Sequence, residues 1–230
     1  GSYNNAFGKS ALAASVTGDY NAAFGYAALA NANGASANSA FGGLALIANT
    51  SGAFNTAIGT QALQANTTAS NNTAVGYQAG YSNTTGTPNT FLGFQAGYAN
   101  TTGVAGTFIG HTAGVANTGD ANTFVGYQTG KGNTSGTNNT ALAVNTLYSN
   151  TTGSQNTALG REALFSNTTA SYNTAVGYTA GYSNQTGTKV VFVGEAAGYN
   201  STGNFNVFVG PEAGYAVSTG TSNTFVGAAN

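Results

Sequence analysis

The chain repeats one short pattern of apolar and polar residues from its first residues to its last. The stretch 72–79 reads Asn-Thr-Ala-Val-Gly-Tyr-Gln-Ala, and its glycine, Gly76, recurs at steps of 17 residues, two of which are shortened to 16. We call this position the anchor; fourteen coils carry it, and one of them has Ala143 in place of glycine. A fixed period of this length is typical of a solenoid, in which each repeat forms one coil stacked on the next. The anchor glycines are Gly8, Gly25, Gly42, Gly59, Gly76, Gly93, Gly110, Gly126, Gly160, Gly177, Gly194, Gly210 and Gly227.

The pattern favours strands over helices, because a glycine inside a helix costs about 1 kcal/mol relative to alanine. We expect each coil to hold a short strand that ends at the anchor, a second strand after it, and a polar turn such as 83–86, Asn-Thr-Thr-Gly. The sequence therefore predicts an all-β parallel β-solenoid of about fourteen coils. It forms one continuous repeat domain over 1–230, uncapped at both ends.

The residues one and two positions before the anchor are apolar in every coil, as Ala74 and Val75 are. We expect the large residue directly before the anchor to form the core. Because neighbouring residues of a strand point to opposite faces, such a strand is apolar on both faces and needs a partner beyond its own coil. The pattern thus predicts lateral association of several chains.

Two other positions exchange volume with one another. One position lies four residues after an anchor, and the other lies two residues before the next anchor. Where the first is leucine, the second is alanine. Where the first is glycine, as at Gly80, the second is phenylalanine, as at Phe91. The pair Gly130 and Ala141 departs from this rule. A core packed to constant density predicts that these positions touch across adjacent coils. Three residues after the anchor the residue is small, which we interpret as a place where two sheets approach closely.

Two columns of aromatic residues follow the anchor. Five positions after it we expect an aromatic ladder along the stack, with contact to a sugar ligand as the alternative. The ladder comprises Tyr81, Tyr98, Tyr148, Phe165, Tyr182, Tyr199 and Tyr215. The second column, directly after the anchor, includes Tyr26, Tyr77, Phe94, Tyr127 and Tyr178.

The polar turns carry triplets of the Asn-X-Thr/Ser type, which are acceptors for glycosylation. We interpret them first as an asparagine ladder that seals the turns, with glycosylation of exposed turns as the alternative. The asparagines are Asn49, Asn66, Asn83, Asn100, Asn133, Asn150, Asn167, Asn184 and Asn200.

Composition narrows the classes of function. Only 4% of the residues are charged and the net charge is −1, which argues against binding nucleic acid or an anionic membrane surface. No apolar run is long enough to span a bilayer, so we expect no membrane insertion. The chain has no Cys, Met or Trp, so disulfides, metal thiolates and sulfur oxidation are excluded, which suits an extracellular or virion surface.

Residues for catalysis are few and scattered. His111 lies in a variable column, Glu195 and Glu212 are a weak candidate for paired carboxylates, and Asp19 and Asp120 form no calcium-binding ladder. We expect no enzyme activity, no metal and no cofactor. The threonines three positions before the anchor admit an ice-binding function, although Val191 and Val207 interrupt their column.

Units such as 72–80, Asn-Thr-Ala-Val-Gly-Tyr-Gln-Ala-Gly, with their Asn-Thr-Thr-Gly turns, resemble the YadA-like head repeats of trimeric autotransporter adhesins. They also resemble the similar repeats of phage tail fibres and bacterial surface fibres. The resemblance implies a left-handed β-roll that is trimeric, extracellular and used for attachment. The period differs, since the head repeat of that family is nearer fourteen residues, and no stalk, anchor or chaperone domain is recognisable.

These observations predict a non-enzymatic structural repeat protein of an extracellular fibre or filament, located at the cell surface or virion surface. Its partners are copies of itself, as a lateral trimer, an end-to-end polymer or both. A receptor-binding adhesin or tail-fibre module with a cell-surface or glycan receptor is the first alternative. An ice-binding or glycan-degrading solenoid is the second.

Overall fold

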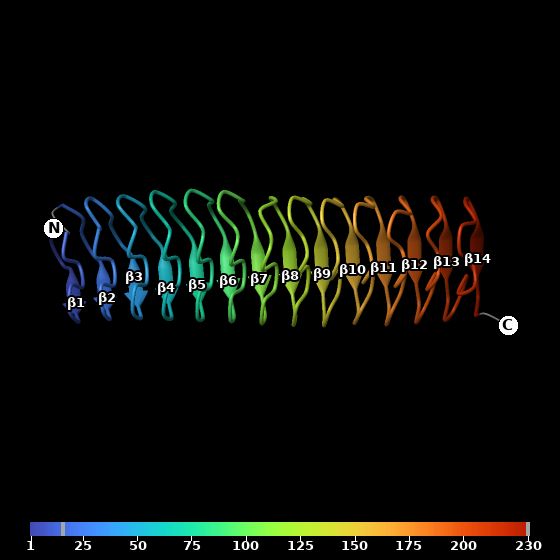
Figure 1. Ribbon diagram of the computed structural model, residues 1–230, viewed down its shortest axis with the longest axis horizontal. Helices are drawn as coiled ribbons and strands as arrows, with labels where there is room; N and C mark the ends of the chain where they lie inside the picture. The colour runs from blue at the N-terminus through green and yellow to red at the C-terminus, as the bar shows by residue number, and fades with distance from the viewer. Residues whose placement is uncertain (15–16, 229–230) are drawn as a thin grey trace. The chain divides into compact units, whose positions relative to one another are not determined.

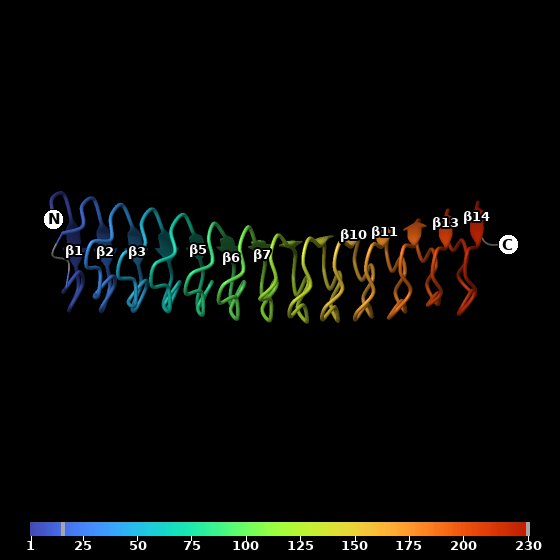
Figure 2. The same cartoon turned by 90° about the horizontal axis from the view of Figure 1, so that it is seen from above.

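A computed structural model describes residues 1–14 and 17–228. Contacts within the chain divide it into two units, Gly1–Thr118 and Gly119–Asn230, and each is described by itself. Within each unit the chain winds through successive coils, and each coil contributes one three-residue strand to a parallel sheet (Figure 1; Figure 2 gives the view from above). Each unit is therefore a parallel β-solenoid, the fold class that the repeat predicts.

In the first unit the strands pair in chain order, and the register advances by one whole repeat: Ala74 of β5 lies opposite Phe91 of β6. Equivalent columns therefore lie directly above one another. The strands are β1 (Asn5–Phe7), β2 (Ala22–Phe24), β3 (Ser39–Phe41), β4 (Thr56–Ile58), β5 (Thr73–Val75), β6 (Thr90–Leu92) and β7 (Thr107–Ile109).

The second unit follows the same rule and also contains one of the 16-residue steps. Phe192 of β12 lies opposite Phe208 of β13, so the shortened step leaves the pairing of the strands in register. The coil is shorter in its turn, which runs through Ser201, Thr202 and Gly203. The strands are β8 (Thr123–Val125), β9 (Thr140–Leu142), β10 (Thr157–Leu159), β11 (Thr174–Val176), β12 (Val191–Val193), β13 (Val207–Val209) and β14 (Thr224–Val226).

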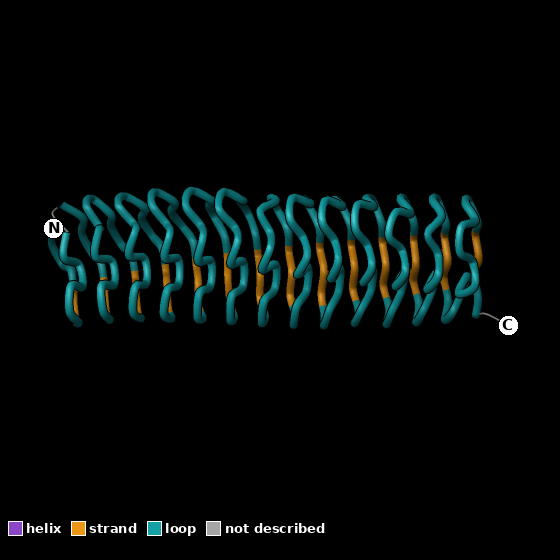
Figure 3. Tube along the Cα trace, viewed as in Figure 1, coloured by secondary structure: helices purple, strands orange, loops and turns teal. Residues whose placement is uncertain are grey.

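Our prediction of a second strand after the anchor is wrong. That segment is a series of turns, as the colouring of Figure 3 shows. Its backbone is left-handed two and four residues after the anchor, with φ of 54° at Gln78 and 59° at Gly80. Such residues cannot continue a pleat. The segment still pairs from coil to coil, because the amide of Gly80 donates to the carbonyl of Ala96 at 2.9 Å.

Glycine is required at the anchor by the spacing of the coils. At Gly42 φ is +139°, and a Cβ there would lie 2.5 Å from the carbonyl carbon of Gly59 in the next coil. The close approach is thus between successive coils of one stack, so our interpretation of two sheets meeting was wrong. Ala143 is the one anchor residue in the described chain with a side chain, and its φ is 114°.

The predicted contact between the glycine of one coil and the phenylalanine of the next is confirmed, and a second contact lies within a single coil. A Cβ on Gly80 would lie 2.5 Å from Cδ2 of Phe91 in the next coil. A phenylalanine also fills the space over the glycine of its own coil, since a Cβ on Gly130 would lie 2.6 Å from Cδ2 of Phe124. That contact explains why Gly130 is retained although the next coil has Ala141.

The large residue directly before the anchor is not the core, contrary to our expectation. The middle residue of each strand, such as Ala57 or Phe108, points inward and is fully buried, except in the first and last coils. Because side chains alternate along a strand, the residues on either side of it point outward. Ile58 is 42% exposed and Leu142 is 51% exposed.

Candidate association surface

The outer face of each sheet carries two parallel rows of side chains, one from the first and one from the last residue of each strand. The last residues form the apolar row, which is half-buried or exposed along its whole described length. In the first unit it consists of Phe7, Phe24, Phe41, Ile58, Val75, Leu92 and Ile109. In the second unit it consists of Val125, Leu142, Leu159, Val176, Val193, Val209 and Val226.

The apolar row is continuous and uncharged within each unit. Phe24 and Phe41 stack with ring centroids 4.8 Å apart and an interplanar angle of 5°, so their outer faces form one smooth surface. The neighbouring row consists mainly of threonines, such as Thr73, and contains no charged residue. A contiguous exposed apolar strip of this kind is typical of surfaces that bind another molecule.

An asparagine ladder that the sequence analysis missed stands inside the coils, four positions before the anchor. Oδ1 of Asn55 accepts from the backbone amide of Asn72 at 2.9 Å, and Nδ2 of Asn72 donates to the carbonyl of Gly86 at 3.0 Å. Both side chains are buried. The signal was present, since asparagine precedes nearly every strand, but we assigned meaning only to the threonine that follows it.

The asparagines considered for glycosylation form a second internal ladder rather than an exposed edge. Nδ2 of Asn66 donates to Oδ1 of Asn49 at 2.9 Å and to the carbonyl of Ala69 at 3.0 Å. The interpretation of these asparagines as a ladder that seals the turns is thus confirmed, and a glycan on such a buried side chain has no space. Asn200 lies one position away and is half-buried. The buried members are Asn49, Asn66, Asn83, Asn100, Asn133, Asn150, Asn167 and Asn184.

The expected aromatic ladder stacks on the face opposite the strand. In the second unit Phe165 and Tyr182 have ring centroids 5.0 Å apart, and Tyr182 and Tyr199 repeat this spacing, both with interplanar angles of 3°. Burial, followed by the neighbouring Tyr182 and Tyr215, raises the pKa of Tyr199 above the ordinary tyrosine value of 10.0. At the start of this ladder Nζ of Lys131 donates to the hydroxyl of Tyr148 at 3.1 Å. In the first unit Tyr81 and Tyr98 stack at 4.9 Å.

The second aromatic column, directly after the anchor, is exposed. Tyr77 is 45% exposed and stacks at 5.5 Å on Phe94, which in turn stacks at 4.9 Å on His111. The histidine is thus one ring in an aromatic column. In the second unit the guanidinium of Arg161 lies 5.9 Å from the ring centroid of Tyr178.

The acidic candidates do not converge on a site. Glu195 and Glu212 are both exposed, and their contact is through the backbone, where the amide of Glu212 donates to the carbonyl of Glu195 at 2.7 Å. Within the described residues, no group of three His, Cys, Asp or Glu side chains is placed to hold a metal ion. The described chain also lacks a helix with the length and apolarity needed to cross a bilayer.

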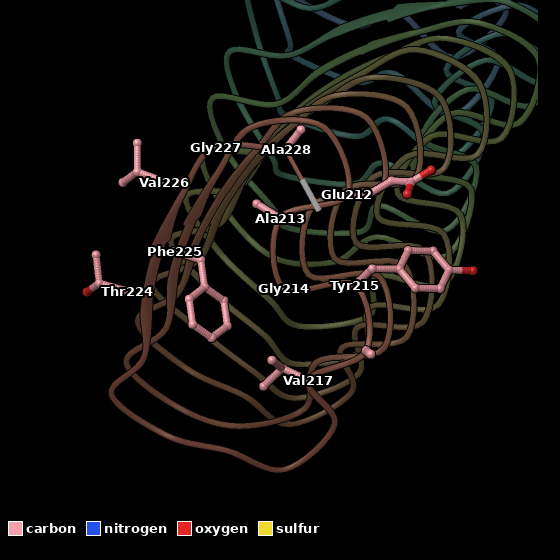
Figure 4. A pocket seen from close by; sticks show the side chains of 11 residues that line it. Glu212, Ala213, Gly214, Tyr215, Val217, Thr224, Phe225, Val226, Gly227 and Ala228 are labelled. Atoms are coloured by element: carbon pink, nitrogen blue, oxygen red, sulfur yellow. The ribbon is translucent and has the colours of Figure 1, made fainter. Parts of the chain in front are cut away.

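A hollow in the second unit lies at its last coil and is the interior of the solenoid seen from its end. Figure 4 shows Phe225 pointing into the coil, whereas Thr224 and Val226 point outward from the same strand and Tyr215 points outward on the far side. The lining residues belong to the core and to the two outer faces already described. The hollow is therefore part of the packing scheme of the coils.

Comparison with known proteins adds no identity to this geometry. No protein-family model matches the chain, and no curated protein is significantly similar to it.

Proposed function

We propose that this protein is a non-enzymatic structural repeat element of an extracellular fibre, which associates laterally with copies of itself and displays a surface for attachment. The apolar row carries this proposal. It gives each sheet an outer face that is apolar, uncharged and regularly spaced, and burial of apolar surface is the dominant favourable term in most protein association. A location outside the cell is supported by the resemblance to adhesin and tail-fibre repeats.

A second copy is the occupant that this row fits best. Equivalent side chains recur at every coil, so two rows of the same chain match one another along their length without a change of spacing. The adhesin head repeats that this sequence resembles are trimeric. We therefore retain the trimer as the leading assembly.

The test is the mass of the assembly in solution, measured by sedimentation or by light scattering after size exclusion. We expect wild-type protein to be oligomeric and the double variant Ile58→Lys, Leu92→Lys to be monomeric, with unchanged β-structure by circular dichroism. Thr85→Lys, in an exposed turn remote from the strands, is the matched control and should stay oligomeric. A wild-type monomer at every concentration refutes the proposal, and filaments that persist in the double variant refute the lateral interface.

A receptor-binding role is the second candidate, and the exposed column of Tyr77 and Phe94 favours it. Stacked aromatic faces at the surface are suited to hold sugar rings or another flat apolar group. Binding of labelled protein to a glycan array and to cells tests this role. We expect Tyr77→Ala with Phe94→Ala to abolish binding while leaving the oligomeric state unchanged; retention of binding contradicts the assignment.

A further inference from the structure

The tyrosines of this chain fall into two structural groups, paired and isolated. Paired tyrosines occupy the same column in adjacent coils and stack: Tyr182 on Tyr199, and Tyr199 on Tyr215 at 5.1 Å. The first unit repeats the arrangement with Tyr81 on Tyr98 at 4.9 Å and with Tyr3 on Tyr20 at 5.0 Å. Isolated tyrosines have a different residue in both flanking coils.

Tyrosine is also the side chain of this protein that a one-electron oxidant attacks. The sequence has 13 tyrosines but no Cys, Met or Trp, so the side chains that normally compete for oxidants are missing. The stacked rings keep part of their surface accessible to an oxidant. Tyr182 and Tyr199 are half-buried, and Figure 4 shows the hydroxyl of Tyr215 pointing away from the coil.

We propose that the stacked tyrosine pairs are sites of oxidative cross-linking, at which a haem peroxidase with hydrogen peroxide joins adjacent coils of one chain as dityrosine. The pairs Tyr182–Tyr199 and Tyr199–Tyr215 are the principal sites, and Tyr81–Tyr98 is the corresponding site of the first unit. This proposal does not depend on lateral association or on a receptor.

The reaction balances with that oxidant. Each phenol loses one electron and one proton to give a phenoxyl radical, and the two radicals join through one ring carbon next to each hydroxyl-bearing carbon. The two hydrogens on those ring carbons then move to the oxygens and restore both phenols. Overall the pair loses two electrons and two protons, and hydrogen peroxide accepts them to give two molecules of water.

The fold favours reaction within the chain. Two radicals on adjacent coils are held about one strand spacing apart, so they meet without diffusing, and well-oriented groups in one molecule react at effective concentrations of about 10⁵ M or more. Phenylalanine forms no phenoxyl radical, so Phe165 separates Tyr148 from the rest of the ladder.

The test treats folded protein with peroxidase and limiting peroxide and maps the cross-linked peptides by mass spectrometry. We expect peptides joining Tyr182 to Tyr199 and Tyr199 to Tyr215 in chains that keep their monomer mass less two hydrogens for each cross-link. Tyr199→Phe should remove both cross-links, and Phe165→Tyr should add new ones to Tyr148 and Tyr182. Either variant keeps a six-membered ring in the ladder, so folding is retained and is checked by the melting temperature.

Tyr172 is the internal control for exposure. It is 59% exposed, more than any ring of the ladder, but Gln155 and Lys189 flank it in its column. If accessibility alone directs the reaction, Tyr172 will dominate the products as cross-links between chains. That outcome overturns the proposal, as does a yield of Tyr182–Tyr199 cross-link that is equal in folded and in denatured protein.

Discussion

Phe91 lies directly over Gly80 of the preceding coil, so close that a Cβ on the glycine would be 2.5 Å from the ring. The same ring lies next to the ring of Phe108 in the next coil, tilted by 36° with centroids 5.7 Å apart. One coil earlier the sizes are reversed: Leu63 takes the place of the glycine, and Ala74 takes the place of the phenylalanine. A single interior volume is therefore filled by either of two combinations of side chains.

We expect Gly80→Leu to overpack this interior and to lower the free energy of unfolding by ~1 to 3 kcal/mol. The backbone itself accepts leucine, since Leu63 occupies the same column with φ of 49°. Combining Gly80→Leu with Phe91→Ala recreates the natural junction of one coil earlier and should recover most of the loss. Urea denaturation of the four proteins in this cycle measures the coupling; additive effects contradict the contact.

Ala143→Gly should stabilise the second unit. Alanine at φ of 114° is strained, and such a conformation costs of order 1 kcal/mol or more. The gain appears as a higher melting temperature. Gly160→Ala is the mirror experiment one coil later, where φ is +129° and a Cβ would crowd the carbonyl of Gly177, and it should be destabilising. A lower melting temperature for Ala143→Gly would show that the methyl group contributes packing that outweighs its strain.

Asn156→Ala should be among the most damaging substitutions of a polar side chain. Its Oδ1 accepts from the amide of Asn173 at 3.0 Å and its Nδ2 donates to the carbonyl of Ala170 at 2.9 Å, both in the buried interior. Each group left unpaired costs about 1 to 3 kcal/mol. Asn138→Ala is the control and should lose much less, because its exposed side-chain amide donates to the Thr137 hydroxyl. Alanine already occupies this column at Ala37 and Ala105 with φ of 55°. Equal melting temperatures for the two variants would refute a structural role for this ladder.

Stability of the second unit should fall at alkaline pH. The folded chain raises the pKa of Tyr199, so above the ordinary tyrosine pKa of about 10 the unfolded chain loses its proton first and is favoured. Below that pH both states are protonated and the effect vanishes. Melting temperatures at about pH 8 and about pH 11 should differ less in Tyr199→Phe than in wild type. An identical difference in the two proteins would remove Tyr199 as the cause.

The period, the parallel register and the pairing of Gly80 with Phe91 were predictable because each follows from the regular spacing of residue sizes. The direction in which each strand faces was not. Val75 is larger and more apolar than Ala74, so hydrophobicity alone places valine inside, yet the anchor geometry leaves room only for the middle residue of the strand. The sequence predicted that both faces of the strand are apolar, but only the coordinates show which of the two faces is the outer one.

The internal asparagines were predicted only in part: the ladder that contains Asn66 was one interpretation of the sequence, whereas the ladder that contains Asn72 was missed. Polar residues in turns normally face water, whereas Asn66 faces inward because the carbonyls of the turn need donors that the tight backbone does not supply. The left-handed backbone after the anchor, for example at Leu63, could not be predicted from residue propensities, because these assign leucine to helices or strands. Both features depend on the neighbouring coil, and a local pattern does not reveal them.

The 16-residue step between β12 and β13 shows that the circumference of a coil and the position of its strand are separable quantities. A residue is removed from the turn around Ser201 while Phe192 and Phe208 remain opposite one another. Insertions and deletions in evolution can therefore accumulate along the turn edge without breaking the lattice of outward side chains on the opposite edge. The length and sequence of the turn can therefore vary from coil to coil, whereas every added coil must place its strand in register with the sheet.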